Sequence, residues 1–195
     1  MKTLKYILCT LIFSYTLFGQ SFGRNKVQYR EFDWSFIQTP NFDIYFYGEN
    51  QNLAEFTSKI AEDSYKQIST HLAWDLRNRV SILVYNSHNE FQQTNVVGPY
   101  MSEGIGGVTE LFKNRIVFPF DGDFEQFRHV IHHELVHAML NDMVYGGTAQ
   151  NMVASRTRVR IPLWANEGLA EFLSSNWDTK ADMVLRDIAV HERMS

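Results

Sequence analysis

A pair of histidines four positions apart is the feature of this sequence best suited to chemistry. The stretch HHELVH occupies residues 132–137 and contains His133 and His137. On a helix these two side chains lie one turn apart and project in the same direction, so both imidazoles can bind one metal ion. Glu134 lies about 100° further around the helix, where its carboxylate can act as a general base on a water molecule at the ion. Because so short a pattern also arises by chance, the surrounding residues must supply the rest of a metal site.

The residues around this stretch predict a helix with clear ends. Asp123 is a typical N-cap residue, and Gln126 follows it at the spacing of a capping box. Gly146 and Gly147 are suited to end the helix. Between these ends, apolar residues recur at helical spacing and form one stripe: Phe127, Val130, Ile131, Leu135 and Ala138. The histidine pair is therefore expected on an amphipathic helix.

A catalytic zinc ion needs a third protein ligand and one open coordination position. The stretch IPLWANEGLAEFLSS, residues 161–175, predicts another helix with Pro162 in its first turn. Its Glu167 and Glu171 project to one side, where two carboxylates repel each other unless a cation lies between them. A zinc site accounts for both, with Glu167 as the third ligand and Glu171 as acceptor of the outer N–H of a ligand histidine. If Glu167 is only a surface carboxylate, Glu171 is the alternative ligand.

HELVH followed by LWANEGLAEF resembles the gluzincin metallopeptidases, and within them the peptidase MA-like group related to aminopeptidase N and thermolysin. The resemblance covers roughly residues 42–187. It implies a zincin-like fold with Zn²⁺ as the cofactor. It also implies that His133, His137 and Glu167 are the zinc ligands and that Glu134 is the base. The implied reaction is hydrolysis of peptide bonds by a metal-activated water.

Two features depart from this family pattern. Residues 138–166 form a longer connection to Glu167 than aminopeptidase N relatives have. In addition, no tyrosine or histidine after Glu167 can be assigned as the family's transition-state-stabilising residue. For substrate binding, GIGGVTE at residues 104–110 is expected to form an edge strand that pairs with an extended substrate. Gly107 and Glu110 are its candidate substrate-binding residues, since Glu110 resembles the glutamate that binds the free amine in those relatives.

The remaining pattern predicts one α+β domain with a mixed β-sheet and packing helices. The chain has 195 residues, 45% of them hydrophobic, which is enough for one buried core. The expected elements are strands 42–47 and 79–85, helices 50–72 and 88–97, and a hairpin of strands 106–111 and 114–120. The strand over residues 79–85 is expected to be buried on both faces. Clustered aromatic residues are expected in the core and on strand faces: Phe32, Trp34, Phe36, Phe42, Tyr45 and Tyr47.

Residues 1–19 are expected to be a secretory signal peptide. A short basic start precedes an apolar run over residues 6–18, and cleavage is expected near Gly19. An uncleaved anchor is the alternative. The single cysteine, Cys9, lies inside this segment, so a metal site in the exported protein would use His, Asp and Glu. We expect a periplasmic, outer-membrane-associated or secreted protein, with residues 20–195 forming the peptidase MA-like metallopeptidase domain.

The partners follow from charge and from a further resemblance. The net charge is −4 and no basic run is present, so nucleic acid is not expected as a partner. KVQYREFDW and FDIYFY resemble the start of exported bacterial chains that continue into a TolB-like β-propeller. The domain is therefore expected to be incomplete at its C-terminal end. A peptide or protein substrate, a following β-propeller and other envelope proteins are the expected partners.

Two alternatives to a peptidase remain open at this point. The chain could be a catalytically inactive, zinc-retaining binding module of a larger envelope protein, or only a folding scaffold within it. An intact Glu134 favours an enzyme, because a purely structural site has no use for a base. His129 and His132 are expected to be structural or solvated, because three histidines on consecutive turns cannot all reach one ion.

Overall fold

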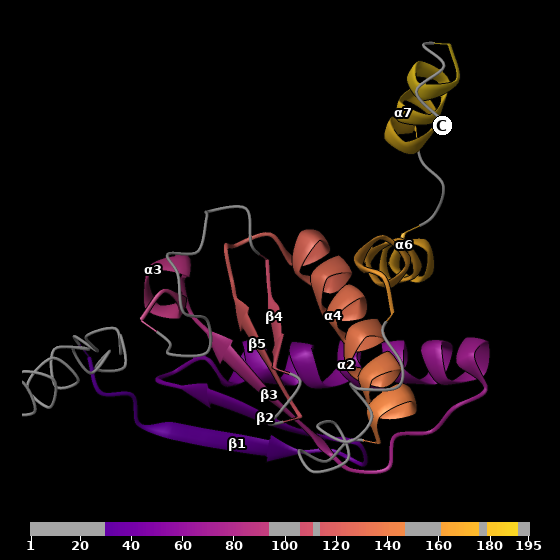
Figure 1. Ribbon diagram of the computed structural model, residues 1–195. Coiled ribbons are helices and arrows are strands. Elements are labelled where there is room, and N and C mark those ends of the chain that lie inside the picture. The colour runs from indigo at the N-terminus through magenta and orange to yellow at the C-terminus, as the bar shows by residue number, and fades with distance from the viewer. Residues whose placement is uncertain (1–29, 94–105, 111–113, 147–160, 176–178, 191–195) are drawn as a thin grey trace, which may run out of the picture.

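A computed structural model of the chain describes residues 30–93, 106–110, 114–146, 161–175 and 179–190 (Figure 1). The predicted signal segment, residues 1–19, lies outside these ranges. Within them, no helix is both long and apolar enough to cross a membrane. The elements, in chain order, are β1 (Trp34–Gln38), β2 (Phe42–Tyr47), α2 (Gln51–Leu72), β3 (Val80–Tyr85), α3 (His88–Phe91), β4 (Val108–Glu110), β5 (Arg115–Pro119), α4 (Phe124–Tyr145), α6 (Leu163–Ser174) and α7 (Thr179–Val190).

The five strands form one mixed sheet in the order β1-β2-β3-β5-β4. Strands β2, β3 and β5 are parallel neighbours, whereas β1 and β4 pair in the antiparallel direction at the two ends of this order. The helix α2 connects β2 to β3, because parallel neighbours need a crossover. The predicted α+β class with a mixed sheet and packing helices is confirmed. The predicted hairpin corresponds to the antiparallel pair β4 and β5.

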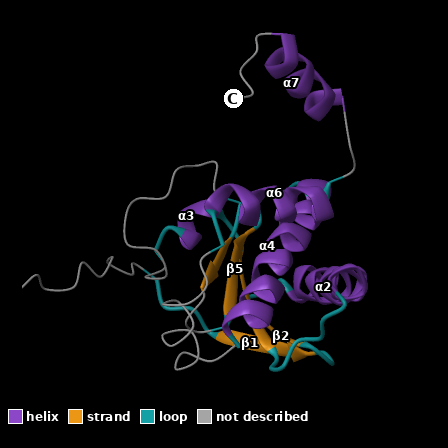
Figure 2. Cartoon of the chain, turned by 45° about the vertical axis from the view of Figure 1, so that its right-hand side comes forward, coloured by secondary structure: helices purple, strands orange, loops and turns teal. Residues whose placement is uncertain are grey.

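The main core lies between the sheet and the helices α2 and α4, which also pack against each other (Figure 2). Alternate strand residues face this core, because successive side chains of a strand point to opposite faces. Ile44, Ile82 and Ile116 are fully buried and lie side by side in the register of the three parallel strands. From α4, Ile131 and Leu135 reach the same core. Burying one such side chain contributes about 1.5–3 kcal/mol.

Aromatic side chains cover the opposite face of the sheet. Tyr47 and Tyr85 are buried there, and the ring centroid of Trp34 lies 4.9 Å from the first and 5.4 Å from the second. The Tyr47 hydroxyl donates to Glu90 Oε2 at 2.6 Å. Burial and this hydrogen bond raise the pKa of Tyr47 above its usual range, so its phenol stays protonated and donates to Glu90.

The structure contains one strand that the sequence pattern does not predict, β1. Its five residues, WSFIQ, pair along most of β2. None of them is fully buried, so the strand lacks the alternation of buried and exposed residues that marks a half-buried strand. Phe36, predicted for the core or a strand face, lies on this strand and is 58% exposed, with its ring 5.6 Å from that of Tyr45.

Two further elements differ from their predicted form. The helix predicted over residues 88–97 ends at Phe91, because Phe91 fills the aromatic layer and the following glutamines have no apolar group to bury; residues 94–97 lie outside the described part of the chain. The strand β3 is fully buried on one face only. Val80, Ile82 and Val84 have no exposed surface, whereas Ser81 and Leu83 on the other face are partly exposed.

The helix α4 begins and ends where the sequence predicts. Asp123 Oδ1 accepts hydrogen bonds from the backbone N–H groups of Glu125 at 2.9 Å and Gln126 at 3.1 Å. At the other end Gly146 has a φ of 78°, a left-handed conformation that glycine adopts without strain. The next helix starts slightly later than expected, since Pro162 is its N-cap residue and not part of its first turn.

Replacing Asp123 with alanine is expected to destabilise the protein by about 1 kcal/mol, because two backbone donors of α4 lose their acceptor. For a chain of this size that loss lowers the thermal midpoint by about 2–4 °C, measurable by circular dichroism. Asp121→Ala is the matched control, since Asp121 is an exposed aspartate just before the cap. An equal loss in both variants would contradict the capping role.

Candidate metal centre

The two motif histidines converge on one point beside α4. Their Nε2 atoms lie 3.2 Å apart, and their ring centroids are separated by 4.9 Å. The exposed fraction is 21% for the His133 side chain and 9% for that of His137. This arrangement follows from the one-turn spacing of the two residues, as the sequence predicts.

A carboxylate from α6 completes this group. The helix α6 packs against α4 and presents Glu167, whose Oε2 lies 3.5 Å from Nε2 of His133 and 3.5 Å from Nε2 of His137. The three donor atoms thus form a nearly equilateral triangle. His133, His137 and Glu167 could hold a metal ion in this arrangement.

Glu171 lies one turn further along α6 and faces a different atom. Its Oε2 is 3.5 Å from Nδ1 of His133, the ring nitrogen that does not point to Glu167. This is the position expected for a carboxylate that orients a ligand histidine. His137 has no such partner, since its Nδ1 is buried and meets no hydrogen-bonding atom of the described residues.

Glu134 does not belong to the triangle of donors and lines an open pocket next to it. The pocket has a volume of about 280 Å³ and is bounded by the two glycines just before β4 and by residues of α4 and α6: Gly106, Gly107, His129, Val130, His133, Glu134 and Glu171. Thr109 Oγ1 donates a hydrogen bond of 2.6 Å to Glu134 Oε2. The base predicted from the motif is therefore held by a residue that the sequence did not single out.

The two candidate substrate-binding residues are placed differently. A Cβ atom at Gly107 would lie 2.9 Å from Glu134 Cγ and 2.8 Å from a ring carbon of Phe118, so only glycine allows this close approach. Glu110 is not among the residues lining the pocket. It pairs with Arg115 on the neighbouring strand, with Nε 2.5 Å from its Oε2. An amine-binding role for Glu110 stays a prediction.

The other two histidines of α4 lie outside the triangle of donors. His132 is partly buried, and burial lowers its pKa, with further lowering by the neighbouring histidines. It belongs to neither histidine–glutamate group of the described residues. His129 lies beside Glu171, with Nε2 to Oε2 at 3.7 Å. Its spacing from His133 places the two rings on one face of α4, but the contact with Glu171 depends on the position of α6.

No family model, curated protein or solved structure matches the chain. The site is therefore characterised by what its own residues can bind. Two imidazole nitrogens and one carboxylate oxygen converge from α4 and α6, and a second carboxylate, that of Glu134, lies in an adjoining pocket. Three ligand atoms beside an open pocket could hold a metal ion at a position that a substrate can reach.

Proposed function

We propose that the protein is an exported zinc-dependent peptidase, which hydrolyses peptide bonds in the cell envelope or after secretion. The observation that carries this proposal is the convergence of His133, His137 and Glu167 next to the pocket that contains Glu134. The resemblance of both motifs to gluzincin metallopeptidases agrees with it. We also propose that the fold is zincin-like, with α4 and α6 carrying the ligands beside a mixed sheet.

The donor geometry fits zinc. An ion held at zinc's usual 2.0–2.2 Å from nitrogen and oxygen, with tetrahedral angles, has its ligand atoms about 3.3–3.5 Å apart. The three distances here are 3.2, 3.5 and 3.5 Å. Two imidazoles with one carboxylate is also a donor set of catalytic zinc sites, which keep one position open. Bound zinc would polarise the peptide carbonyl and lower the pKa of the attacking water.

Glu134 is suited to move the proton. Thr109 donates to its Oε2, which fixes the carboxylate and leaves Oε1 without a donor among the described residues. Oε1 can then take a proton from the attacking water and pass it to the leaving amine.

The remaining residues position the substrate and one ligand. β4 lies at the end of the strand order, and Gly107 immediately before it lines the pocket, so an extended peptide could pair with this strand. Glu171 Oε2 faces Nδ1 of His133 at 3.5 Å, and Nε2 of the same ring faces the other ligands. An extended peptide segment is the substrate that such an edge selects.

A metal-retaining binding module is the second candidate function. The residues lining the described pocket include no tyrosine or arginine that could stabilise a developing oxyanion. The two functions differ in one measurement, the cleavage of a broad peptide library by the zinc-loaded protein. Cleavage that stops with a chelator and returns with zinc supports the peptidase, whereas zinc binding without cleavage of any peptide supports the binding module.

Removing zinc is expected to lower the thermal midpoint strongly, because the ion binds the folded chain far better than the unfolded one. At free zinc a thousandfold above its dissociation constant, binding contributes about 4 kcal/mol, which corresponds to about 8–16 °C for a chain of this size. Scanning calorimetry with zinc and with a chelator measures this difference. A His137→Ala variant should show little response, and an equal response in both proteins would refute the assigned ligands.

A further inference from the structure

A second group of donor atoms lies on the other side of His133. His129 Nε2 is 3.7 Å from Glu171 Oε2, and His133 Nδ1 is 3.5 Å from the same oxygen. One possible ligand atom from each of these three residues lies within 4.8 Å of the other two. The group shares His133 with the first centre but uses the opposite ring nitrogen, so one ion cannot occupy both places.

Ser175 contacts two residues of this group, His129 and Glu171. Its hydroxyl donates to Glu171 Oε1 at 2.7 Å and lies 3.4 Å from His129 Nδ1. One hydroxyl can donate to the carboxylate and accept from an Nδ1–H at the same time. His129 then has its free lone pair on Nε2, the atom that faces Glu171 Oε2. Outer contacts of this kind fix the ring nitrogen that a histidine offers to a metal.

We propose that His129, Glu171 and His133 form a second site for a divalent transition-metal ion, which fills when zinc is in excess over the first centre. The donors would be Nε2 of His129, Oε2 of Glu171 and Nδ1 of His133. Two imidazole nitrogens and a carboxylate suit zinc, copper, nickel or cobalt better than calcium or magnesium. Filling both sites requires the remaining N–H proton of His133 to be released to solvent, so that the ring would offer a lone pair on each nitrogen; this shared ring couples the two sites.

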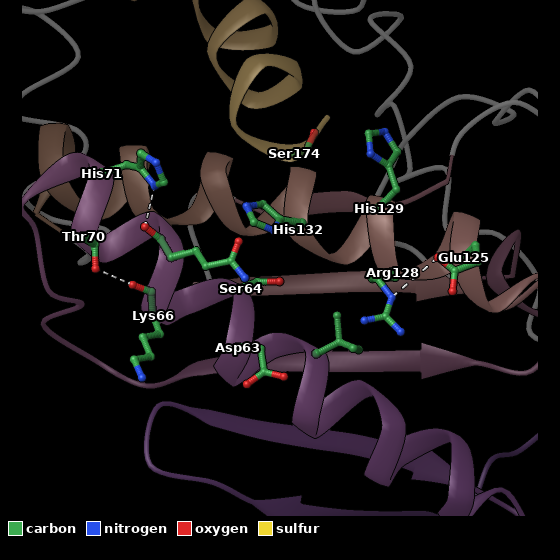
Figure 3. A pocket seen from close by; sticks show the side chains of 12 residues that line it. Asp63, Ser64, Lys66, Thr70, His71, Glu125, Arg128, His129, His132 and Ser174 are labelled. Atoms are coloured by element: carbon green, nitrogen blue, oxygen red, sulfur yellow. Dashed lines mark hydrogen bonds and ion pairs between the residues drawn. The ribbon is translucent and has the colours of Figure 1, made fainter. Parts of the chain in front are cut away.

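The second site is open to solvent and should be the weaker of the two. The His129 side chain is 38% exposed and that of Glu171 is 58% exposed, whereas His137 in the first centre is 9% exposed. His129 also lines a larger polar pocket of about 770 Å³ between α2 and α4 (Figure 3). Asp63 and Glu125 add carboxylates to the wall of this pocket, and Lys66 and Arg128 add one positive charge each. Because His129 lines this open pocket, a hydrated cation can reach it from this side.

The chain offers a matched control on the same pocket. His71 of α2 lines the pocket together with His129, and its Nδ1 lies 2.8 Å from the backbone oxygen of Gln67 (Figure 3). It belongs to neither histidine–glutamate group of the described residues. Losing His71 removes one exposed imidazole without touching the proposed site, so it reports on unspecific zinc binding by histidine.

Equilibrium dialysis of the whole chain against zinc, followed by metal analysis, tests the proposal. The wild type and His71→Ala are expected to bind two ions per chain, whereas His129→Ala binds one with unchanged affinity. Ser175→Ala should keep both ions but bind the second about ten to a hundred times more weakly. Circular dichroism checks that each variant is folded.

Two results would overturn the second site: saturation of the folded wild type at one ion that His129→Ala also binds, or a second ion that persists in His129→Ala. Failure of the proposed peptidase would look different. In that case a single ion would be lost in His129→Ala and kept in Glu167→Gln, which would leave the second site as the one that binds metal.

Discussion

Replacing Glu134 with glutamine is expected to leave zinc bound and to slow peptide hydrolysis by about a hundredfold or more. Glutamine has the same shape as glutamate, and Glu134 is not one of the three converging ligands. The Thr109 hydroxyl can still donate to the amide oxygen, so the side chain keeps its place beside β4. The loss is confined to proton transfer, because an amide cannot accept the proton of the attacking water. Initial rates and bound zinc, measured on the same samples, separate these effects.

A glutamate on the same helix provides the control for this variant. Glu125 lies in the first turn of α4 and is exposed, so Glu125→Gln changes the charge of α4 equally without altering the pocket of the base. It is expected to retain the rate of the wild type. If Glu134→Gln loses zinc to the same extent as a ligand variant, Glu134 binds the metal and is not the base.

The candidate metal centre could be predicted in part, because each pair of its residues depends on local spacing. His133 and His137 are one turn apart on one helix, and Glu167 and Glu171 are one turn apart on another. Helical geometry alone brings each pair to one face. The approach of α4 and α6 depends on tertiary packing, and it was indicated by the carboxylate pair of the second helix and by the resemblance of the two motifs.

Contacts that depend on strand register could not be predicted in the same way. A shift of one residue turns every side chain of a strand to the other face. In β4 that choice decides whether Thr109 or Glu110 faces α4, and three described residues are too few to show an alternation. The resemblance to the amine-binding glutamate made Glu110 the candidate in the sequence. In the structure, the register directs Thr109 to Glu134 and pairs Glu110 with Arg115. The strand β1 is missed for a similar reason, since its residues show no buried face.

The role of His129 shows a limit of counting ligands along one helix. Three histidines on successive turns cannot reach one ion, and the sequence therefore predicts that His129 is structural or solvated. In the structure His129 lies outside the group formed by His133, His137 and Glu167. The ring of His133 has two nitrogens, however, and a carboxylate from α6 meets the second one. Such a shared ring depends on the position of α6, which spacing within α4 does not contain.

Replacing Glu167 with glutamine is expected to release zinc and to abolish activity with it. The variant exchanges a charged oxygen ligand for a weaker neutral one at 3.5 Å from both histidines. Glu171→Gln removes only an orienting contact to His133, for which a loss of about ten- to a hundredfold in zinc affinity is typical. The loss in Glu167→Gln should be larger. Competition with a fluorescent chelator, at less than one zinc per chain, compares the two variants without filling the second site.

This pair of variants also tests which carboxylate is the third ligand. Both residues lie on α6 and are about half exposed, so the two substitutions should disturb the fold equally little. Retention of zinc in Glu167→Gln together with its loss in Glu171→Gln would move the third ligand by one helical turn. The ion would then lie between His129 and the Nδ1 side of His133, away from His137. Glu134 would remain in the pocket beside it, because that pocket is lined by His129, His133 and Glu171 as well.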